Sequence, residues 1–176
     1  MGNVGSQGGQ APPFSILGSA PQTGTPFNPP QEASSPPQAG NGDARSRIRA
    51  GLLQRGLPDH IADGFVENFQ EESGLDSGIN EISPLVKGSR GGFGLAQWTG
   101  PRRRELEQFA QQRGLPVNDE SLQMDFLMQE LQGSESNAAR TIMSSKSSGE
   151  AASAIARDFL RPAPANLQKR LAKFGG

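Results

Sequence analysis

The chain has 176 residues, and its 17 Lys and Arg against 18 Asp and Glu give a net charge of −1 at pH 7. This balance lacks the basic excess typical of nucleic-acid-binding proteins, so no nucleic-acid partner is expected. The absence of cysteine excludes disulfides, thiolate zinc sites and thiol catalysis. No apolar run is long enough to cross a bilayer, so no membrane partner is expected either.

Residues 1–43 differ in composition from the rest of the chain. They hold eight of the 14 prolines and eight of the 23 glycines, but only two charged residues, Glu32 and Asp43. Such a segment cannot bury enough apolar surface to offset the entropy of ordering, and it lacks the basic and apolar pattern of a secretory signal peptide. It is predicted to be either a disordered tail or an extended arm that docks in a partner's groove. The candidate anchors of such an arm are Phe14, Ile16, Leu17 and Phe27.

Residues 44–176 are predicted to form one mainly α domain, because no stretch of four or more residues alternates convincingly as a β-strand. Gly74 and Gly114 are suited to the left-handed turn that closes a helix, and Ser147 with Glu150 forms a capping box. Apolar periodicity and these end signals predict helices over 44–56, 58–73, 101–113, 120–132, 135–144, 148–160 and 164–174.

The most informative stretch is 69–104, FQEESGLDSGINEISPLVKGSRGGFGLAQWTGPRRR. Glu72 comes at the end of a predicted helix, seven residues after Phe65 and three after Phe69, so it lies close to the buried face. An acid partly withdrawn from water keeps its proton more readily, which is what a glycosidase requires of its proton donor. Glu71 is one position round the helix and predicted to face solvent, and it is the alternative donor.

Several motifs in this order and spacing resemble the phage tail lysozyme family, which is related to goose-type lysozymes and soluble lytic transglycosylases. The resemblance spans about residues 45–174. The matching pieces are Glu72-Ser73-Gly74, the GLAQWTG run from Gly94 to Gly100, Arg102-Arg103, the segment from Leu106 to Ala110, and Phe159-Leu160-Arg161-Pro162. The resemblance implies a lysozyme-like helical domain with a glycine-rich active-site loop. It also implies cleavage of the β-1,4 bond between N-acetylmuramic acid (MurNAc) and N-acetylglucosamine (GlcNAc) in peptidoglycan.

The resemblance further implies roles for individual residues. Glu72 is expected to be the general acid, and Ser73 either orients this acid, touches the sugar or is only a polar residue at the helix end. Gly94 and Gln97 are expected at the substrate cleft. Trp98 is either a sugar-stacking side chain or a core residue.

Arg102 belongs to a cluster of three arginines, 102–104, which begins a helix. The cluster is expected to pair with acids such as Glu72 or Glu81, to contact peptide-stem carboxylates, or to form a solvated face. No cofactor and no metal are expected. His60 is the only histidine, which excludes a site with two imidazole ligands and argues against a Ser-His peptidase.

The second carboxylate decides the mechanism, since a hydrolase uses one to activate water or to stabilise the transition state. Asp76 and Glu81 are the candidates, and Glu81 is favoured because it lies nine residues after Glu72, beyond two glycine-containing turns. A single acid would instead indicate a lytic transglycosylase that gives 1,6-anhydro-MurNAc products. The absence of tyrosine favours hydrolysis, because many transglycosylases carry a tyrosine-asparagine motif.

The family resemblance also implies where the protein acts and with what. It implies a virion enzyme, in the tail or inside the particle, that opens the host cell wall during genome delivery and works in the host periplasm. Its expected partners are peptidoglycan glycan strands and, through residues 1–43, other tail or virion proteins. The competing interpretation is a catalytically inactive structural adaptor with a lysozyme fold.

Overall fold

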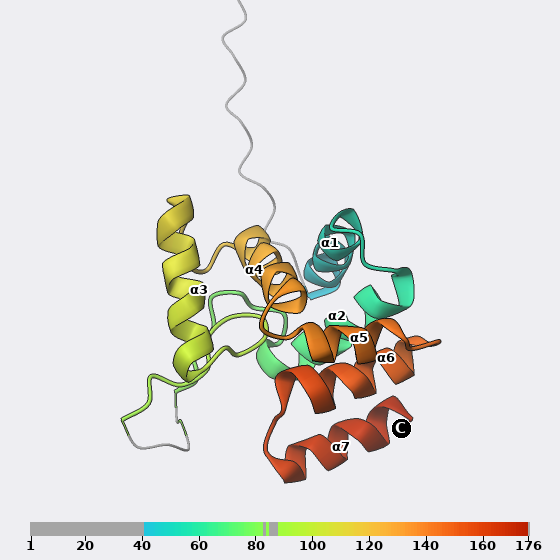
Figure 1. Ribbon diagram of the computed structural model, residues 1–176. Coiled ribbons are helices and arrows are strands. Elements are labelled where there is room, and N and C mark those ends of the chain that lie inside the picture. The colour runs from blue at the N-terminus through green and yellow to red at the C-terminus, as the bar shows by residue number, and fades with distance from the viewer. Residues whose placement is uncertain (1–40, 83, 85–87, 176) are drawn as a thin grey trace, which may run out of the picture. The chain divides into compact units, whose positions relative to one another are not determined.

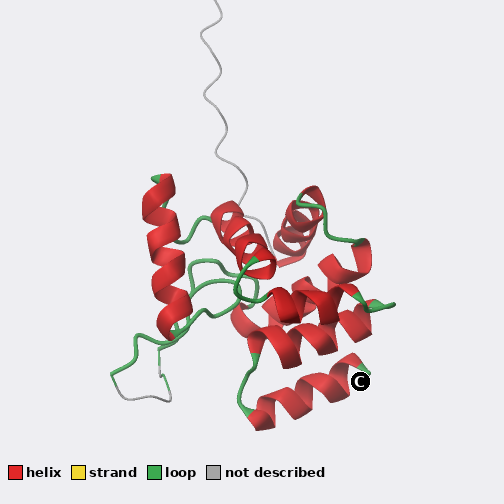
Figure 2. Ribbon diagram, in the orientation of Figure 1, coloured by secondary structure: helices red, strands yellow, loops and turns green. Residues whose placement is uncertain are grey.

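The computed structural model describes residues 41–82, 84 and 88–175 (Figure 1). Helices connected by loops make up this part of the chain, and Figure 2 shows no strand within it. The predicted mainly α fold is therefore confirmed. The seven α-helices are α1 (Asn41–Gln54), α2 (Asp59–Ser73), α3 (Gly100–Arg113), α4 (Glu120–Gln132), α5 (Ser136–Met143), α6 (Ser148–Ala154) and α7 (Pro164–Phe174).

The helix ends follow the predicted local signals. Gly74 and Gly114 adopt left-handed backbone conformations with φ of 62° and 63°, and each donates its N–H to a carbonyl of the last helical turn. Asp119 caps α4 by accepting a hydrogen bond from the Leu122 N–H at 2.7 Å. Ser147 likewise caps α6, since its Oγ accepts from the Glu150 N–H at 3.2 Å.

Two helix boundaries differ from the sequence prediction. α1 begins at Asn41, three residues before the expected start, so it includes the end of the segment assigned to the arm. The helix expected over 148–160 is α-helical only to Ala154 and continues as a π-helical segment, η1 (Ile155–Leu160). The remainder of the expected arm lies outside the described residues. None of the described helices is long and apolar enough to span a bilayer.

Close packing between α2 and α6 fixes the helix that carries Glu72. Gly64 permits this approach, because a Cβ atom at this position would lie 2.9 Å from the Ala152 backbone nitrogen. The buried Asn68 amide donates to the carbonyls of Gly64 and Ala152, at 2.9 and 3.0 Å. The Phe65 ring packs edge-on against the Phe159 ring with their centroids 5.9 Å apart. The C-terminal turn of α2 is therefore held by the core.

The loop between α2 and α3 is held by short backbone pairings rather than by a sheet. Phe93 and Trp98 exchange backbone hydrogen bonds of 3.0 and 3.1 Å, and the Gly94 N–H donates to the Ile79 carbonyl at 2.9 Å. The buried Gln123 side chain of α4 accepts from the Leu95 N–H at 2.9 Å. Its amide nitrogen also donates to the Ser77 carbonyl of this loop at 2.8 Å and to the Val117 carbonyl, between α3 and α4, at 2.9 Å. These contacts fix the GLAQW run beside the end of α2.

Candidate active site

Glu72 projects from the last turn of α2 and is largely shielded from solvent, its side chain being 15% exposed. Its Oε1 atom accepts a hydrogen bond of 2.7 Å from Nη1 of Arg170 in α7. Glu71, its neighbour, is exposed and forms an ion pair with Lys173 of the same helix. The sequence-based prediction of partial burial for Glu72 is therefore confirmed, whereas its arginine partner was not predicted.

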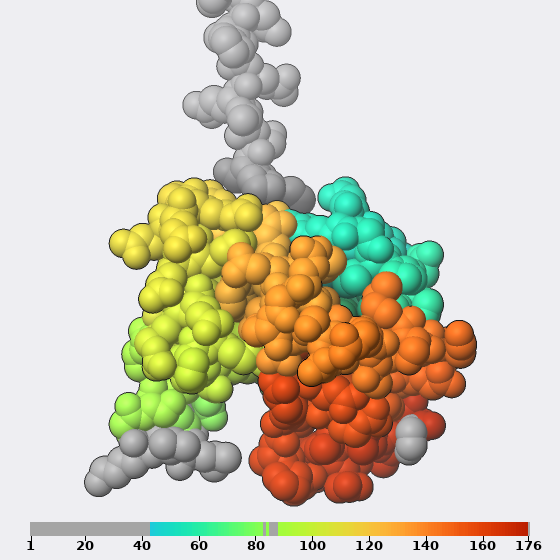
Figure 3. All heavy atoms as spheres, in the orientation of Figure 1, coloured from blue at the N-terminus to red at the C-terminus, as the bar shows by residue number. Residues whose placement is uncertain are grey.

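A cleft of about 440 Å³ brings Glu72 together with two other predicted site residues, Glu81 and Gln97. One side of the cleft is formed by the end of α2 and the following loop, and the other by the segment from Leu160 to Arg170. The surface is hollowed between the yellow-green and the red parts of the chain (Figure 3). The complete lining is Glu71, Glu72, Glu81, Gly92, Ala96, Gln97, Thr99, Leu160, Arg161, Pro162, Ala163, Asn166 and Arg170.

Glu81 is held in the cleft by the glycine pair opposite it. Its Oε2 atom accepts from the Gly92 N–H at 2.9 Å, and its own N–H donates to the Gly92 carbonyl at 2.8 Å. Gly91 has a φ of 77°, and a Cβ atom there would lie 2.8 Å from the Glu81 carbonyl oxygen. The two glycines thus allow the backbone to approach closely enough to direct this carboxylate.

Gln97 adopts a left-handed backbone conformation with a φ of 49°, which is unfavourable for a residue with a side chain. Its Nε2 atom donates to the Gly94 carbonyl at 2.9 Å. Its Oε1 atom accepts no hydrogen bond from the residues described. The amide oxygen is therefore available to a hydroxyl or N–H donor in the cleft.

Ser73 and Gly94 support the cleft without lining it. The buried Ser73 Oγ contacts the Phe69 and Leu95 carbonyls, at 2.9 and 3.1 Å, and so ties the end of α2 to the GLAQW run. Gly94 has a φ of 72°, and a Cβ atom there would lie about 2.5 Å from the Gln123 amide. In this structure both residues contact protein rather than the open cleft.

Trp98 and Arg102 also lie outside the cleft lining. Trp98 is 1% exposed, and its Nε1–H donates to Oε2 of the buried Glu130 at 2.8 Å. Arg102 donates to both oxygens of the same carboxylate, at 2.6 and 2.9 Å. The expected pairing of Arg102 with Glu72 or Glu81 is therefore wrong, since Glu130 occupies this guanidinium. The core alternative for Trp98 agrees with its burial, because the ring presents almost no surface to a sugar.

A family model described as phage tail lysozyme matches residues 44–173, which is more than half of the chain. The chain belongs to the phage tail lysozyme family. No curated protein sequence gives a significant match. Membership in this family implies a lysozyme-type, peptidoglycan-degrading enzyme associated with virion tails.

The loop between α2 and α3 is anchored to α3 by an ion-pair network around Arg90. Glu107 pairs with Arg90 at 2.7 Å and with Arg103 at 3.2 Å. The Arg103 guanidinium also donates to the carbonyls of Arg90 and Gly91, at 2.8 and 3.0 Å. Mainly through its hydrogen bond, the Arg90 guanidinium holds the pKa of Glu107 below its usual value, with a smaller contribution from Arg103 and against the effect of burial.

Sequence reasoning named Leu160, Arg161 and Pro162 only as part of a family motif, and it missed that they form the second wall of the cleft together with Arg170. Arg161 follows η1 in a left-handed conformation with a φ of 53°, and it lines the cleft beside Pro162. Arg170 is the only buried residue of α7. A signal for Arg170 was present: it falls between Leu167 and Leu171, which with Phe174 form an apolar stripe along α7. A charged residue in such a stripe requires a partner.

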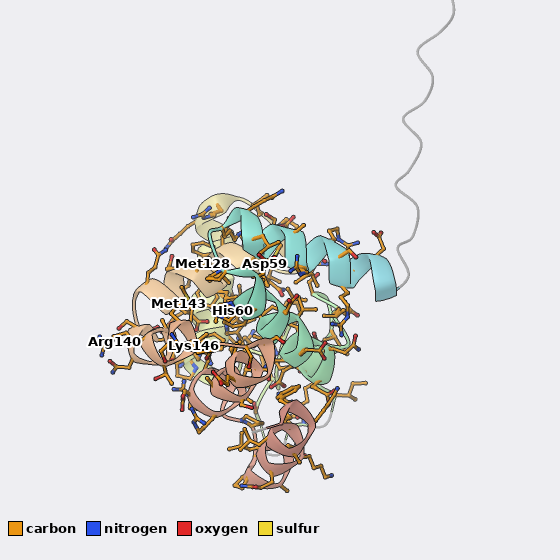
Figure 4. All side chains as sticks on the ribbon, turned by 90° about the vertical axis from the view of Figure 1, so that its right-hand side faces the viewer. Asp59, His60, Met128, Arg140, Met143 and Lys146 are labelled. Atoms are coloured by element: carbon orange, nitrogen blue, oxygen red, sulfur yellow. The ribbon has the colours of Figure 1, made fainter. Side chains whose placement is uncertain are left out.

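His60 lies away from the cleft and takes no part in it. Its Nε2 atom contacts the Ser145 carbonyl oxygen at 2.9 Å, and Figure 4 labels His60 on α2. Among the described residues, no group of three or more His, Asp or Glu side chains is arranged to hold a metal ion.

Proposed function

We propose that this domain hydrolyses the β-1,4 bond between MurNAc and GlcNAc in peptidoglycan, with Glu72 as general acid and Glu81 as the second carboxylate. One observation carries the proposal: two carboxylates from separate segments line the same cleft, together with the Gln97 amide. Glycosidases use such a pair, one group to protonate the leaving oxygen and the other to activate water or to stabilise the positive transition state.

Glu72 suits the acid role because of how its two oxygens are placed. Oε1 is occupied by Arg170, whereas Oε2 accepts no hydrogen bond from the described residues. The second oxygen can therefore carry a proton to a glycosidic oxygen bound in the cleft. Glu71 lines the same cleft but is exposed and paired with Lys173, so it is the less suitable donor.

Glu81 and Gln97 complete the proposed site from the loop side. The single backbone hydrogen bond at Oε2 of Glu81 directs the carboxylate and leaves Oε1 for a water molecule or the sugar. The Gln97 amide oxygen is suited to accept a hydrogen bond from an acetamido N–H or a hydroxyl group. Glycine at position 92 removes side-chain bulk from this part of the cleft.

A lytic transglycosylase is the second candidate, and the backbone contact of Glu81 is the observation that favours it. The Glu81 carboxylate accepts a hydrogen bond from the Gly92 N–H and so holds the loop, a structural role that does not require it to activate water. In a transglycosylase the 6-hydroxyl of the muramic acid attacks, so no second carboxylate is required. The two reactions differ in product, with a reducing end from hydrolysis and a 1,6-anhydro end from transglycosylation.

The biological setting follows from the family rather than from the cleft. We propose that the enzyme travels in the virion and opens the host wall locally during genome delivery. Residues 1–43 are proposed to attach it to another tail or virion protein. Deletion of residues 1–43 is expected to abolish attachment to virus particles. The remaining domain is expected to cleave the wall as before.

The catalytic assignment is tested on purified peptidoglycan with Glu72→Gln and Glu81→Gln. Glu72→Gln is expected to lower the rate by about 100- to 10,000-fold, the usual contribution of a positioned acid. Glu67→Gln is the matched control, because Glu67 lies on the same helix, pairs with Arg45 and does not line the cleft. Unchanged activity in Glu72→Gln would overturn the assignment, and a large loss in Glu71→Gln would transfer the role to that residue.

Mass spectrometry of the released muropeptides separates the two candidate reactions. Reducing muramic ends and a strongly impaired Glu81→Gln variant are expected for the hydrolase. Anhydro ends together with an active Glu81→Gln variant would establish the transglycosylase. Absence of any product from folded wild-type protein would instead favour the structural adaptor.

A further inference from the structure

Arg170 differs from every other residue of α7 in its burial. The apolar side chains of this helix, Leu167, Leu171 and Phe174, are only half-buried, whereas the Arg170 side chain is 9% exposed. Placing a guanidinium in such a position is unfavourable unless it is paired. Its one partner among the described residues is the Glu72 carboxylate. The buried part of α7 is thus directed at the proposed acid.

The geometry of this pair is asymmetric. Arg170 uses a single nitrogen, Nη1, and contacts a single oxygen, Oε1, at 2.7 Å. A two-pronged contact, of the kind that Arg102 makes with Glu130, would occupy both carboxylate oxygens. The one-pronged contact restrains the carboxyl while Oε2 remains unbonded within the described part of the chain.

We propose that Arg170 is a positioning residue that restrains Oε1 of Glu72 so that Oε2 presents its proton to the cleft. The inference rests on the proposed function of Glu72. A carboxyl at the end of a flexible side chain samples several rotamers, and restraint of one oxygen selects the orientation required for proton transfer. Arg170 does not itself have to contact the reacting atoms.

The charges around the pair distinguish Arg170 from its neighbours. The other charged residues of the cleft lining are Glu71, Glu81 and Arg161. Glu71 is paired with Lys173, and Arg161 is paired with Glu135 at 2.7 Å. Arg170 is therefore the cation committed to Glu72, and Lys173, one helical turn away, is its natural control.

The test compares Arg170→Gln, Arg170→Lys and Lys173→Gln in steady-state kinetics on soluble peptidoglycan fragments. Rates are compared at the maximum of each variant's pH profile, because a mechanism with one protonated and one ionised carboxyl group gives a bell-shaped pH dependence. Arg170→Gln is expected to lower kcat by about 10- to 100-fold with little change in KM, since a misplacement of about 1 Å has this cost. Arg170→Lys is expected to restore part of the loss, and Lys173→Gln to behave as wild type.

Several outcomes would overturn the proposal. A folded Arg170→Gln variant with wild-type kcat, or one impaired only in KM, removes the positioning role. A variant faster than wild type at neutral pH shows instead that Arg170 restrains the resting enzyme. Thermal unfolding of each variant identifies losses of activity caused by misfolding. If Arg170→Gln is destabilised, Arg170→Lys is compared with it: higher activity of Arg170→Lys at equal stability supports the positioning role, and equal activity removes it. Inactive wild-type protein removes the proposed function itself, whereas an active wild type with an unaffected Arg170→Gln removes only this inference.

Discussion

Two shielded arginine–glutamate pairs lie in this domain, and they differ in how completely the carboxylate is satisfied. The Glu130 side chain is 2% exposed and accepts two hydrogen bonds from Arg102 and one from the Trp98 indole. The Glu72 side chain is 15% exposed and accepts one hydrogen bond, from Arg170. The first carboxylate lies in the core, and the second lines a cleft.

The difference shows how the same pair of residue types can serve structure or chemistry. Glu130, whose two oxygens are both bonded in the interior, joins α3, α4 and the loop. A carboxylate with one restrained and one unbonded oxygen can exchange a proton with a ligand. Burial alone would rank Glu130 above Glu72 as a site residue, so hydrogen-bond occupancy is the more informative criterion.

Glu130→Gln is expected to give the largest change in stability. The substitution leaves the Arg102 guanidinium with a neutral partner in a shielded site. Breaking a buried ion pair in this way is expected to cost about 3 kcal/mol of stability. Urea unfolding measures this loss as a lower free energy of unfolding.

Glu72→Gln is the comparison variant, and it is expected to cost only about 1 kcal/mol, because Glu72 accepts a single hydrogen bond from Arg170, which the amide oxygen can still accept. Equal losses in the two variants would contradict the distinction between the pairs.

Gly94→Ala tests the loop wall of the cleft and is expected to cost about 2 kcal/mol. The new Cβ atom would meet the Gln123 amide at about 2.5 Å, and the residue would also keep a positive φ of 72°. Gly114→Ala is the matched control, since its φ is 63° but no atom lies within 4 Å of the added carbon. The difference in the free energy of unfolding between the two variants isolates the contact with Gln123. Equal stability would show that Gln123 moves aside at no cost.

The helices could be predicted because their signals are local. Apolar periodicity places α2 and α4, and Gly74, Gly114 and the Ser147 capping box fix the ends at single residues. The exceptions are the start of α1 and the segment η1, because nothing in the spacing of residues 148–160 distinguishes a π-helical segment from the α-helix that was predicted. The loop motif likewise identified Glu72, Glu81 and Gln97, which the structure brings to one cleft.

The rest could not be predicted because it depends on partners distant in sequence. Trp98 and Glu130 are 32 residues apart, and Arg170 is 98 residues from Glu72. Nothing near Arg102 in sequence indicates that a carboxylate on α4 will occupy it. The arginine within the α7 stripe indicated only that a buried acid existed somewhere. Tertiary packing, rather than local pattern, decides which acid pairs with which arginine.

Acidification is expected to loosen the loop where Glu107 pairs with Arg90. Because the pKa of Glu107 is lowered in the fold, its contribution to stability is present above the unfolded value of about 4.3 and is lost as the pH falls through the folded value. The protection factors of residues 88–94 against amide hydrogen exchange are expected to fall below about pH 4 in the wild type.

Glu107→Gln is expected to abolish this pH response. Glu105→Gln should retain it, since Glu105 is exposed on the same helix and has no ion-pair partner among the described residues. An identical response in all three proteins would assign the loosening to other carboxylates.

Trp98 gives the smallest expected effect, which is no response to substrate. As the only tryptophan of the chain it reports its own surroundings by fluorescence, and its burial predicts emission at short wavelength in the folded protein. Saturation of Glu72→Gln with peptidoglycan fragments is expected to leave that emission unchanged, because the ring contacts Glu130 and Phe126 rather than the cleft. Binding is measured independently by calorimetry, so an unchanged spectrum cannot reflect an empty site. A clear spectral shift at saturation would restore Trp98 as a sugar-binding residue, and would mean that ligand binding reorganises the core pair on which the comparison with Glu72 depends.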